Sequence, residues 1–146
     1  MVADNGRNGI FIEAPSGSFS VNALLNRVEA YNNSKSGISV INFGTGTVKT
    51  TEADSVAANN GGDGFTVSSV SGAASLMVVR SVAANNGAGI SADGASATLR
   101  VGQSAVTGNT TSWSFPNGGT LRSYGDNNID GNGDGDPAAP TTIAKK

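Results

Sequence analysis

The sequence contains no cysteine and no histidine. The absence of cysteine excludes disulfides, thiol nucleophiles and thiolate metal sites. The absence of histidine excludes imidazole general bases, Ser-His-Asp triads and the zinc or iron sites that depend on imidazole. Acid-base chemistry near neutral pH would therefore fall to a carboxylate with a raised pKa, or to lysine or tyrosine.

Charged residues and long apolar runs are also scarce. Only 14% of the residues are charged, against about 25% in an ordinary soluble protein. The net charge is -2 and the only basic run is Lys145 and Lys146, so we expect no nucleic-acid partner. No apolar stretch is long enough to span a bilayer, and the first residues lack the features of a signal peptide. We therefore expect no membrane partner and leave the localisation open.

What the sequence does contain is a repeat. The heptapeptide Ser-Val-Ala-Ala-Asn-Asn-Gly occurs twice without change, at residues 55–61 and 81–87. Partial copies of this repeat place an asparagine every 23 to 27 residues, at Asn5, Asn32, Asn59, Asn85, Asn109 and Asn132. A period of this length is typical of solenoids.

Each repeat carries three short stretches with strand character. The first follows a glycine, as in Gly9-Ile-Phe-Ile and Gly37-Ile-Ser-Val, and it has the two-residue period of a strand with one buried face. The third contains an apolar column at Val56, Val82, Val106 and Ile129. A repeat of this size cannot bury its own apolar residues, but stacked repeats can bury them against one another.

The sequence therefore predicts an all-β fold, a right-handed parallel β-helix of about five coils with 23–27 residues per coil. We expect one domain over residues 1–146, with a C-terminal cap over residues 132–146 and coils that start near Asn5, Asn32, Asn59, Asn85 and Asn109. The asparagines should stack in a column, with each amide bonded to the next coil.

Three segments also resemble a known family. They are Val-Ala-Ala-Asn-Asn-Gly-Ala-Gly-Ile (82–90), Thr-Leu-Arg-Val-Gly-Gln-Ser-Ala-Val-Thr-Gly-Asn (98–109) and Leu-Arg-Ser-Tyr-Gly-Asp-Asn-Asn-Ile-Asp-Gly-Asn-Gly (121–133). This combination resembles the bacterial right-handed parallel β-helix repeat proteins, relatives of the pectate-lyase-like superfamily, which includes lyases, hydrolases, epimerases and adhesins. The resemblance implies a secreted or cell-surface protein and a polysaccharide partner. The chain has no obvious N-terminal capping helix, so we expect either further sequence before it or a homo-oligomer through an open N-terminal coil.

A column of basic residues is the first candidate ligand site. Lys49, Arg100 and Arg122 each follow an inward apolar residue of a second strand, so the pattern predicts that they share one outward column, with Met77 between them. Arginine offers a fork of donors that suits the carboxylates of an acidic polysaccharide. The alternative is a solvated strand face that needs these charges for solubility. Trp113, the single tryptophan, is either a sugar-stacking platform or a core plug.

Two carboxylates are the candidate catalytic residues. Glu52 and Asp54 are two residues apart, which allows the separation that glycoside cleavage requires. The alternative for Asp54 is an ordinary ion pair with Arg80 of the neighbouring coil.

An acidic segment near the C-terminus is the candidate metal site. Asp130, Asp134 and Asp136 alternate with glycines, like the start of a calcium loop. The acid that should close such a loop is missing, and the asparagines of the segment belong to the repeat. We therefore expect a turn and no cofactor, with weak Ca2+ binding as the alternative.

These observations favour a non-catalytic structural or binding β-helix module, one that binds polysaccharide or associates with itself. The alternative is a polysaccharide lyase or glycoside hydrolase of the pectate-lyase-like group. Such enzymes cluster several acids on one face, whereas the acids of this chain are dispersed among turns.

Overall fold

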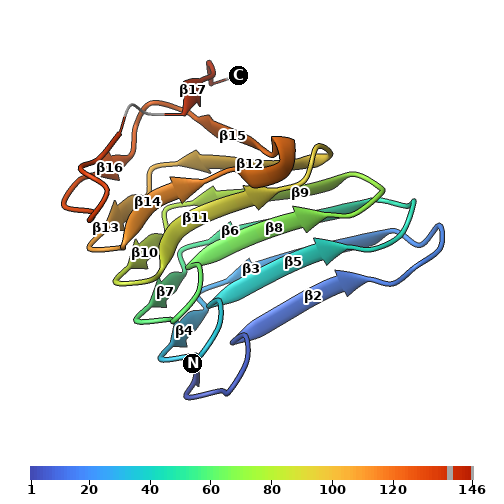
Figure 1. Cartoon of the computed structure of the whole chain (residues 1–146), viewed down its shortest axis with the longest axis horizontal. Coiled ribbons are helices and arrows are strands. Elements are labelled where there is room, and N and C mark those ends of the chain that lie inside the picture. Colours follow the sequence, from blue (N-terminus) through green and yellow to red (C-terminus); the bar gives the residue numbers. More distant parts are fainter. Residues whose placement is uncertain (138–139, 146) are drawn as a thin grey trace.

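The computed structural model describes residues 1–137 and 140–145. Its strands repeat in groups of three, and each strand pairs in parallel with its counterpart one coil further on (Figure 1). The predicted parallel β-solenoid of about five coils is thereby confirmed, while its right-handed sense stays a prediction. Residues 138, 139 and 146 of the predicted C-terminal cap lie outside the described residues.

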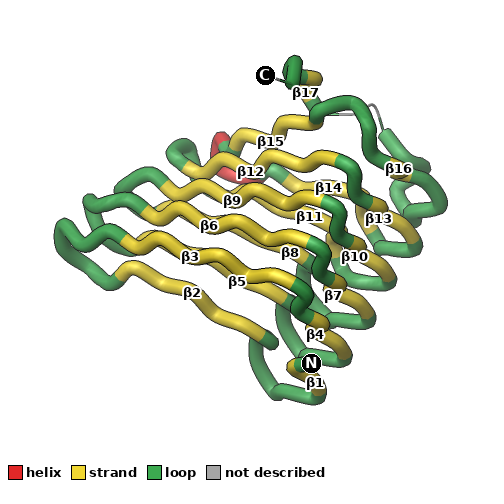
Figure 2. The backbone as a smooth tube through the Cα atoms, turned by 180° about the vertical axis from the view of Figure 1, so that it is seen from behind, coloured by secondary structure: helices red, strands yellow, loops and turns green. Residues whose placement is uncertain are grey.

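Three sheets form the walls of the solenoid (Figure 2). Sheet A contains β1 (Val2–Ala3), β4 (Glu29–Tyr31), β7 (Val56–Ala58), β10 (Val82–Ala84), β13 (Ala105–Thr107) and β16 (Asn128–Ile129). Sheet B contains β2 (Ile10–Ala14), β5 (Ile38–Asn42), β8 (Phe65–Ser69), β11 (Ala88–Asp93) and β14 (Thr111–Ser114). Sheet C contains β3 (Val21–Asn26), β6 (Val48–Ala53), β9 (Ala74–Val79), β12 (Ala97–Gly102), β15 (Thr120–Ser123) and β17 (Thr141–Thr142). A short 3-10 turn, η1 (Pro116–Gly118), precedes β15.

The sheets enclose one narrow core, because alternate residues of each strand point inward. Leu76, Leu99 and Leu121 are in register on β9, β12 and β15, and all three are buried. Phe65 and Ile90 make an equivalent pair in sheet B. Like residues stack on like in this way, so each coil completes the burial of its neighbours.

An asparagine ladder runs the length of one corner. It consists of Asn5, Asn33, Asn60, Asn86, Asn109 and Asn132. The main-chain N–H and the side-chain Nδ2 of each asparagine both donate to Oδ1 of the next one. Between Asn33 and Asn60 the two bonds measure 3.1 and 2.8 Å. The successive steps are 28, 27, 26, 23 and 23 residues.

The predicted asparagine column was therefore one residue early in three coils. Asn32, Asn59 and Asn85 are exposed and adopt positive φ angles of 55, 56 and 56°. They turn the chain in the left-handed conformation that asparagine tolerates, and Gly108 and Gly131 take that place in the later coils. In each asparagine pair, the first residue makes the turn and the second makes the ladder.

The predicted column of valines also combines two different positions of the repeat. Val56 and Val82 are in register with Ala105, whereas Val106 is in register with Ala83. Val106 is buried, and Val56 and Val82 are only half-buried. The small inward column of sheet A consists of Ala30, Ala57 and Ala83.

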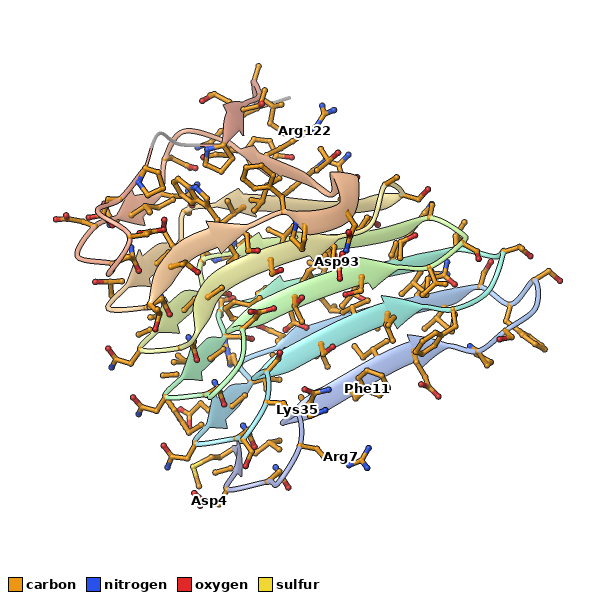
Figure 3. The ribbon with its side chains drawn as sticks, viewed as in Figure 1. Asp4, Arg7, Phe11, Lys35, Asp93 and Arg122 are labelled. Atoms are coloured by element: carbon orange, nitrogen blue, oxygen red, sulfur yellow. The ribbon has the colours of Figure 1, made fainter. Side chains whose placement is uncertain are left out.

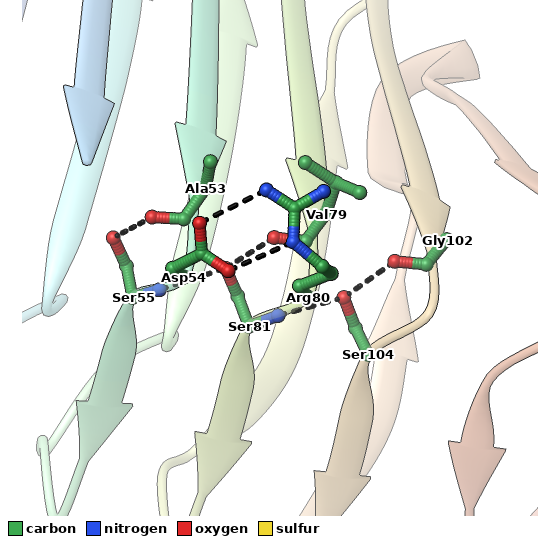
Figure 4. Close-up of polar contacts among 8 residues, drawn as sticks. All are labelled: Ala53, Asp54, Ser55, Val79, Arg80, Ser81, Gly102 and Ser104. Atoms are coloured by element: carbon green, nitrogen blue, oxygen red, sulfur yellow. Dashed lines mark hydrogen bonds and ion pairs between the residues drawn. The ribbon is translucent and has the colours of Figure 1, made fainter. Parts of the chain in front are cut away.

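Serines form a second, shorter ladder at the corner between sheets C and A (Figure 4). The Ser55 N–H donates to Ser81 Oγ, and the Ser81 N–H donates to Ser104 Oγ, both at 3.1 Å. Each hydroxyl also donates to a carbonyl of its own coil, as Ser55 Oγ does to the Ala53 oxygen at 2.9 Å. Two of the three corners therefore carry buried polar ladders.

Asp136 ends the asparagine ladder at its C-terminal end. Its carboxylate accepts hydrogen bonds from the Asn132 N–H at 3.0 Å, from Asn132 Nδ2 at 2.8 Å and from the Gly131 N–H at 2.9 Å. In the earlier coils, the N–H and Nδ2 of the ladder asparagine bind the asparagine of the following coil. Asp136 thus replaces the coil that would come next.

Among the described residues, no helix has the length and apolar character needed to cross a membrane.

The ladder predicts a large effect of one substitution. Asn60 accepts two hydrogen bonds from Asn33, and its Nδ2 donates to the Ala30 oxygen and to Asn86 Oδ1. Asn60→Ala leaves these buried groups without partners, so the free energy of unfolding in urea should fall by about 2–4 kcal/mol. Asn59→Gly is the matched control, because glycine accepts the positive φ there, and it should cost less than about 1 kcal/mol. Equal losses in the two variants would contradict the ladder.

Candidate ligand groove

A pair of arginines lies on the outward face of sheet C. Arg100 of β12 and Arg122 of β15 are in register, and Met77 of β9 occupies the same column one coil earlier. Neighbouring strands are about 4.8 Å apart, so the two guanidinium stems leave the sheet side by side. Figure 3 shows Arg122 at the C-terminal end of the solenoid, far from Phe11 of the first coil.

The arginines line a hollow of about 700 Å³. It is also lined by Met77, Val79, Gly102, Gln103, Tyr124, Asp126 and the segment Ile143, Ala144 and Lys145. The lining residues come from sheet C, from the turns that follow β12 and β15, and from the segment after β17.

Tyr124 lies close against Gly102. A Cβ atom at position 102 would come within 3.0 Å of Tyr124 Cδ2, so glycine leaves the room that the tyrosine ring occupies. The ring is half-buried and lines the hollow together with the two arginines. This combination places an aromatic side chain beside a pair of cations.

The groove has an excess of positive charge. Asp126 forms an ion pair with Lys145 at 2.6 Å and accepts a hydrogen bond from the Gln103 N–H at 3.1 Å. These contacts, with that to Lys145 the largest, lower the pKa of Asp126 below its ordinary value. In the part of the chain that the structure describes, Arg100 and Arg122 form no ion pair. Their charges are therefore available to an anionic ligand.

Lys49 does not join this column, which corrects the predicted alignment. It is in register with Ser75, two positions before Met77, and it therefore lies in the outward column of Thr98 and Thr120. The prediction that Lys49 points outward was right. Its alignment with the next coil depends on the turn before β6, which the pattern of apolar residues does not reveal.

The ring of Trp113 is not exposed. Only 9% of the residue is accessible, and it is in register with Ile90 on the inward face of sheet B. It also borders a small hollow of about 280 Å³ at the C-terminal end of the core, beside Ile129 and Pro137. Trp113 therefore acts as a core plug and does not offer a surface platform for a sugar.

Glu52 and Asp54 do not form a surface carboxylate pair. Glu52 occupies an inward position of β6 between Leu25 and Val78, with none of its surface accessible. Among the described residues, neither carboxyl oxygen of Glu52 has a hydrogen-bond partner, and burial raises the pKa of Glu52 to about 8. Glu52 is therefore protonated at neutral pH and out of reach of a polysaccharide in this structure. Thr50 Oγ1, two residues earlier, is also buried without a partner.

Asp54 forms the ion pair with Arg80 that the stacking predicted (Figure 4). Arg80 donates from Nε to Oδ1 at 2.8 Å and from the second nitrogen to Oδ2 at 2.9 Å. The hydrogen bond from Arg80 is the largest cause of the lowered pKa of Asp54. Both side chains are exposed, so the pair is an ordinary surface contact between coils.

The aspartates of the candidate calcium segment serve as hydrogen-bond acceptors for the chain itself. Asp134 Oδ2 accepts from the N–H and the hydroxyl of Ser112, both at 2.8 Å, and Asp136 caps the asparagine ladder. Asp130 is exposed. The described residues contain no group of three or more acidic side chains placed to hold a metal ion. The geometry is that of a turn, and Ca2+ binding there stays an untested expectation.

The sequence pattern did not single out Asp63 as a functional residue. Burial raises its pKa, while hydrogen bonds from Thr66 and Ser91 act in the opposite direction and the nearby Asp93 raises it further. Thr66 and Ser91 are in register on β8 and β11. Only the stacking of coils brings Ser91 and Asp93 close to Asp63, because both belong to the next coil.

Comparison of the chain with protein-family models, with curated proteins and with solved structures found no match.

The buried Glu52 predicts a pH-dependent stability. Below about pH 4.5 both the folded and unfolded chains bind the proton, and up to about pH 8 only the unfolded chain loses it. The free energy of unfolding should therefore decrease between these values, by a few kcal/mol at most, on the order of 1.4 kcal/mol per pH unit. Glu52→Gln should remove most of this slope in urea unfolding measured at several pH values. The exposed control Glu29→Gln should keep it, and an unchanged slope in Glu52→Gln would contradict the assignment.

Proposed function

We propose that this protein is a non-catalytic binding module whose groove on sheet C binds the carboxylates of an acidic polysaccharide. The observation that carries the proposal is the pair Arg100 and Arg122, in register in one hollow. Each guanidinium can donate two parallel hydrogen bonds to a carboxylate. A polyuronate presents such carboxylates at regular intervals, so it can engage both arginines at once.

Tyr124 offers an aromatic surface on which a sugar ring can pack. Its ring lies against Gly102 and borders the same hollow as the arginines, and aromatic rings provide an apolar surface with a polar tip. The family resemblance of the sequence supports the same ligand class. Membership of the pectate-lyase-like superfamily, bacterial origin and a place outside the cell belong to this proposal.

The alternative function is cleavage of such a polysaccharide by a lyase or glycoside hydrolase. One observation favours it: Asp63 has a raised pKa and Asp93 is near enough to influence it. A carboxyl group with a raised pKa can donate a proton to a glycosidic oxygen, and a second carboxylate can act as base or nucleophile. In that case the reacting carboxyl groups would be those of Asp63, which precedes β8, and of Asp93, at the end of β11.

Binding to polygalacturonate tests the proposal. Arg100→Ala and Arg122→Ala should each raise the dissociation constant about tenfold or more, because a charge-assisted hydrogen bond to the ligand is lost. Binding should weaken as the salt concentration rises. Isothermal calorimetry with polygalacturonate, and with uncharged dextran as the control ligand, measures both effects.

Lys49→Ala is the matched control variant. It removes one positive charge from the outward face of the same sheet but lies in a different column from the arginine pair, so binding should not change. Equal loss in all three variants would indicate a general charge effect and contradict a built groove. Release of sugar fragments in the same samples, abolished by Asp63→Asn, would establish the alternative function.

A further inference from the structure

The first coil has a free edge in all three sheets, since β1, β2 and β3 each stand at the end of their sheet. The Ile10 N–H donates to the Gly37 oxygen, and the Val21 N–H donates to the Thr47 oxygen. These residues, and alternate residues after them, therefore bond to the second coil. The intervening residues direct their main-chain N–H and C=O groups to the free edge. They are Phe11 and Glu13 of β2, and Asn22, Leu24 and Asn26 of β3.

The same edge is apolar. The inward residues Ile10 and Ile12 are only half-buried, whereas Ile38 and Val40, their counterparts in the second coil, are completely buried. Two outward residues of the first coil are also exposed and apolar, Phe11 at 49% and Leu24 at 69%. An unpaired strand edge with an apolar rim is a site for pairing with another chain.

The opposite end of the solenoid is less open to a partner, although β14 and β16 stand at the ends of their sheets there. There the carboxylate of Asp136 already accepts the N–H and Nδ2 bonds of Asn132, the last member of the ladder. The segment that contains β17 also covers the edge of β15. A copy therefore cannot continue the ladder of another copy from this end, which disfavours an open fibre. The capped ladder favours a closed arrangement, in which the edge of the first coil meets the same edge of a second copy about a two-fold axis.

We propose that two copies of this chain join head to head through their first coils, with β2 of each copy pairing antiparallel with β3 of the other. The two strands match in length, with 5 residues in β2 and 6 in β3. Both alternate between half-buried and exposed residues along most of their length. A two-fold axis through β1 exchanges sheets B and C, so it brings these two edges together.

One register satisfies the main chain and the side chains together. It sets Phe11 opposite the partner's Leu24, and Glu13 opposite the partner's Asn22. These four residues direct their N–H and C=O groups to the edge, so each pair exchanges two hydrogen bonds. The two exposed apolar side chains become cross-strand neighbours, and Glu13 meets a neutral amide. The inward residues of both strands then extend one core across the interface.

Engineered cysteines test this register, because the natural chain contains no cysteine. Residues opposite one another in a hydrogen-bonded antiparallel pair have Cα atoms about 5.5 Å apart, within the range of a disulfide. We expect a covalent dimer when Phe11→Cys and Leu24→Cys proteins are mixed and oxidised, and only traces of dimer with either protein alone. Equal cross-linking by a single variant would overturn the register. Absence of cross-linking in the mixture would also overturn it.

Light scattering of the unmodified chain tests the association itself. We expect a monomer–dimer equilibrium whose dissociation constant rises about tenfold or more in Phe11→Ser and in Leu24→Ser, because each change removes exposed apolar area from the interface. Val70→Ser is the control, since Val70 is 65% exposed in a loop outside the first coil. A strict monomer at all concentrations would overturn the proposal, and so would a polymer that grows with concentration.

Discussion

The structure depends on buried polar ladders that join each coil to the next. In the asparagine ladder, every member from Asn33 to Asn109 accepts two hydrogen bonds from one neighbour and donates two to the other. A buried amide without these partners would lower the free energy of unfolding, so the ladder is stable only if the coils stack in one register. That register then determines which side chains of distant coils become neighbours.

The candidate groove is a consequence of this stacking. Arg100 and Arg122 come together because their strands are in register, and the same register excludes Lys49. It also directs Glu52 into the core, between two apolar residues, where its carboxyl group has no partner. A buried acid of this kind destabilises the fold as the pH rises.

The two ends of the solenoid are chemically different. Asp136 ends the asparagine ladder at the C-terminal end, and the groove lies near that end, whereas the first coil has an apolar edge. In a head-to-head dimer the two grooves would lie at opposite ends of the assembly. If both functions that we propose hold, such a dimer presents two binding sites to one polymer or links two polymers, and its avidity exceeds the affinity of a single groove.

The sequence by itself determined the solenoid and the order of its strands, because a period of 23 to 27 residues with alternating apolar positions leaves no other way to bury them. It also placed Asp54 beside Arg80 and Arg100 beside Arg122. The tertiary structure decided the register within each asparagine pair, since either asparagine fits the spacing and only the turn shows which one has positive φ. It likewise decided that Trp113 is buried, that Asp63 lies near Thr66 and Ser91, and that Asp136 ends the ladder. These outcomes depend on how the coils stack, which the spacing along the chain does not reveal.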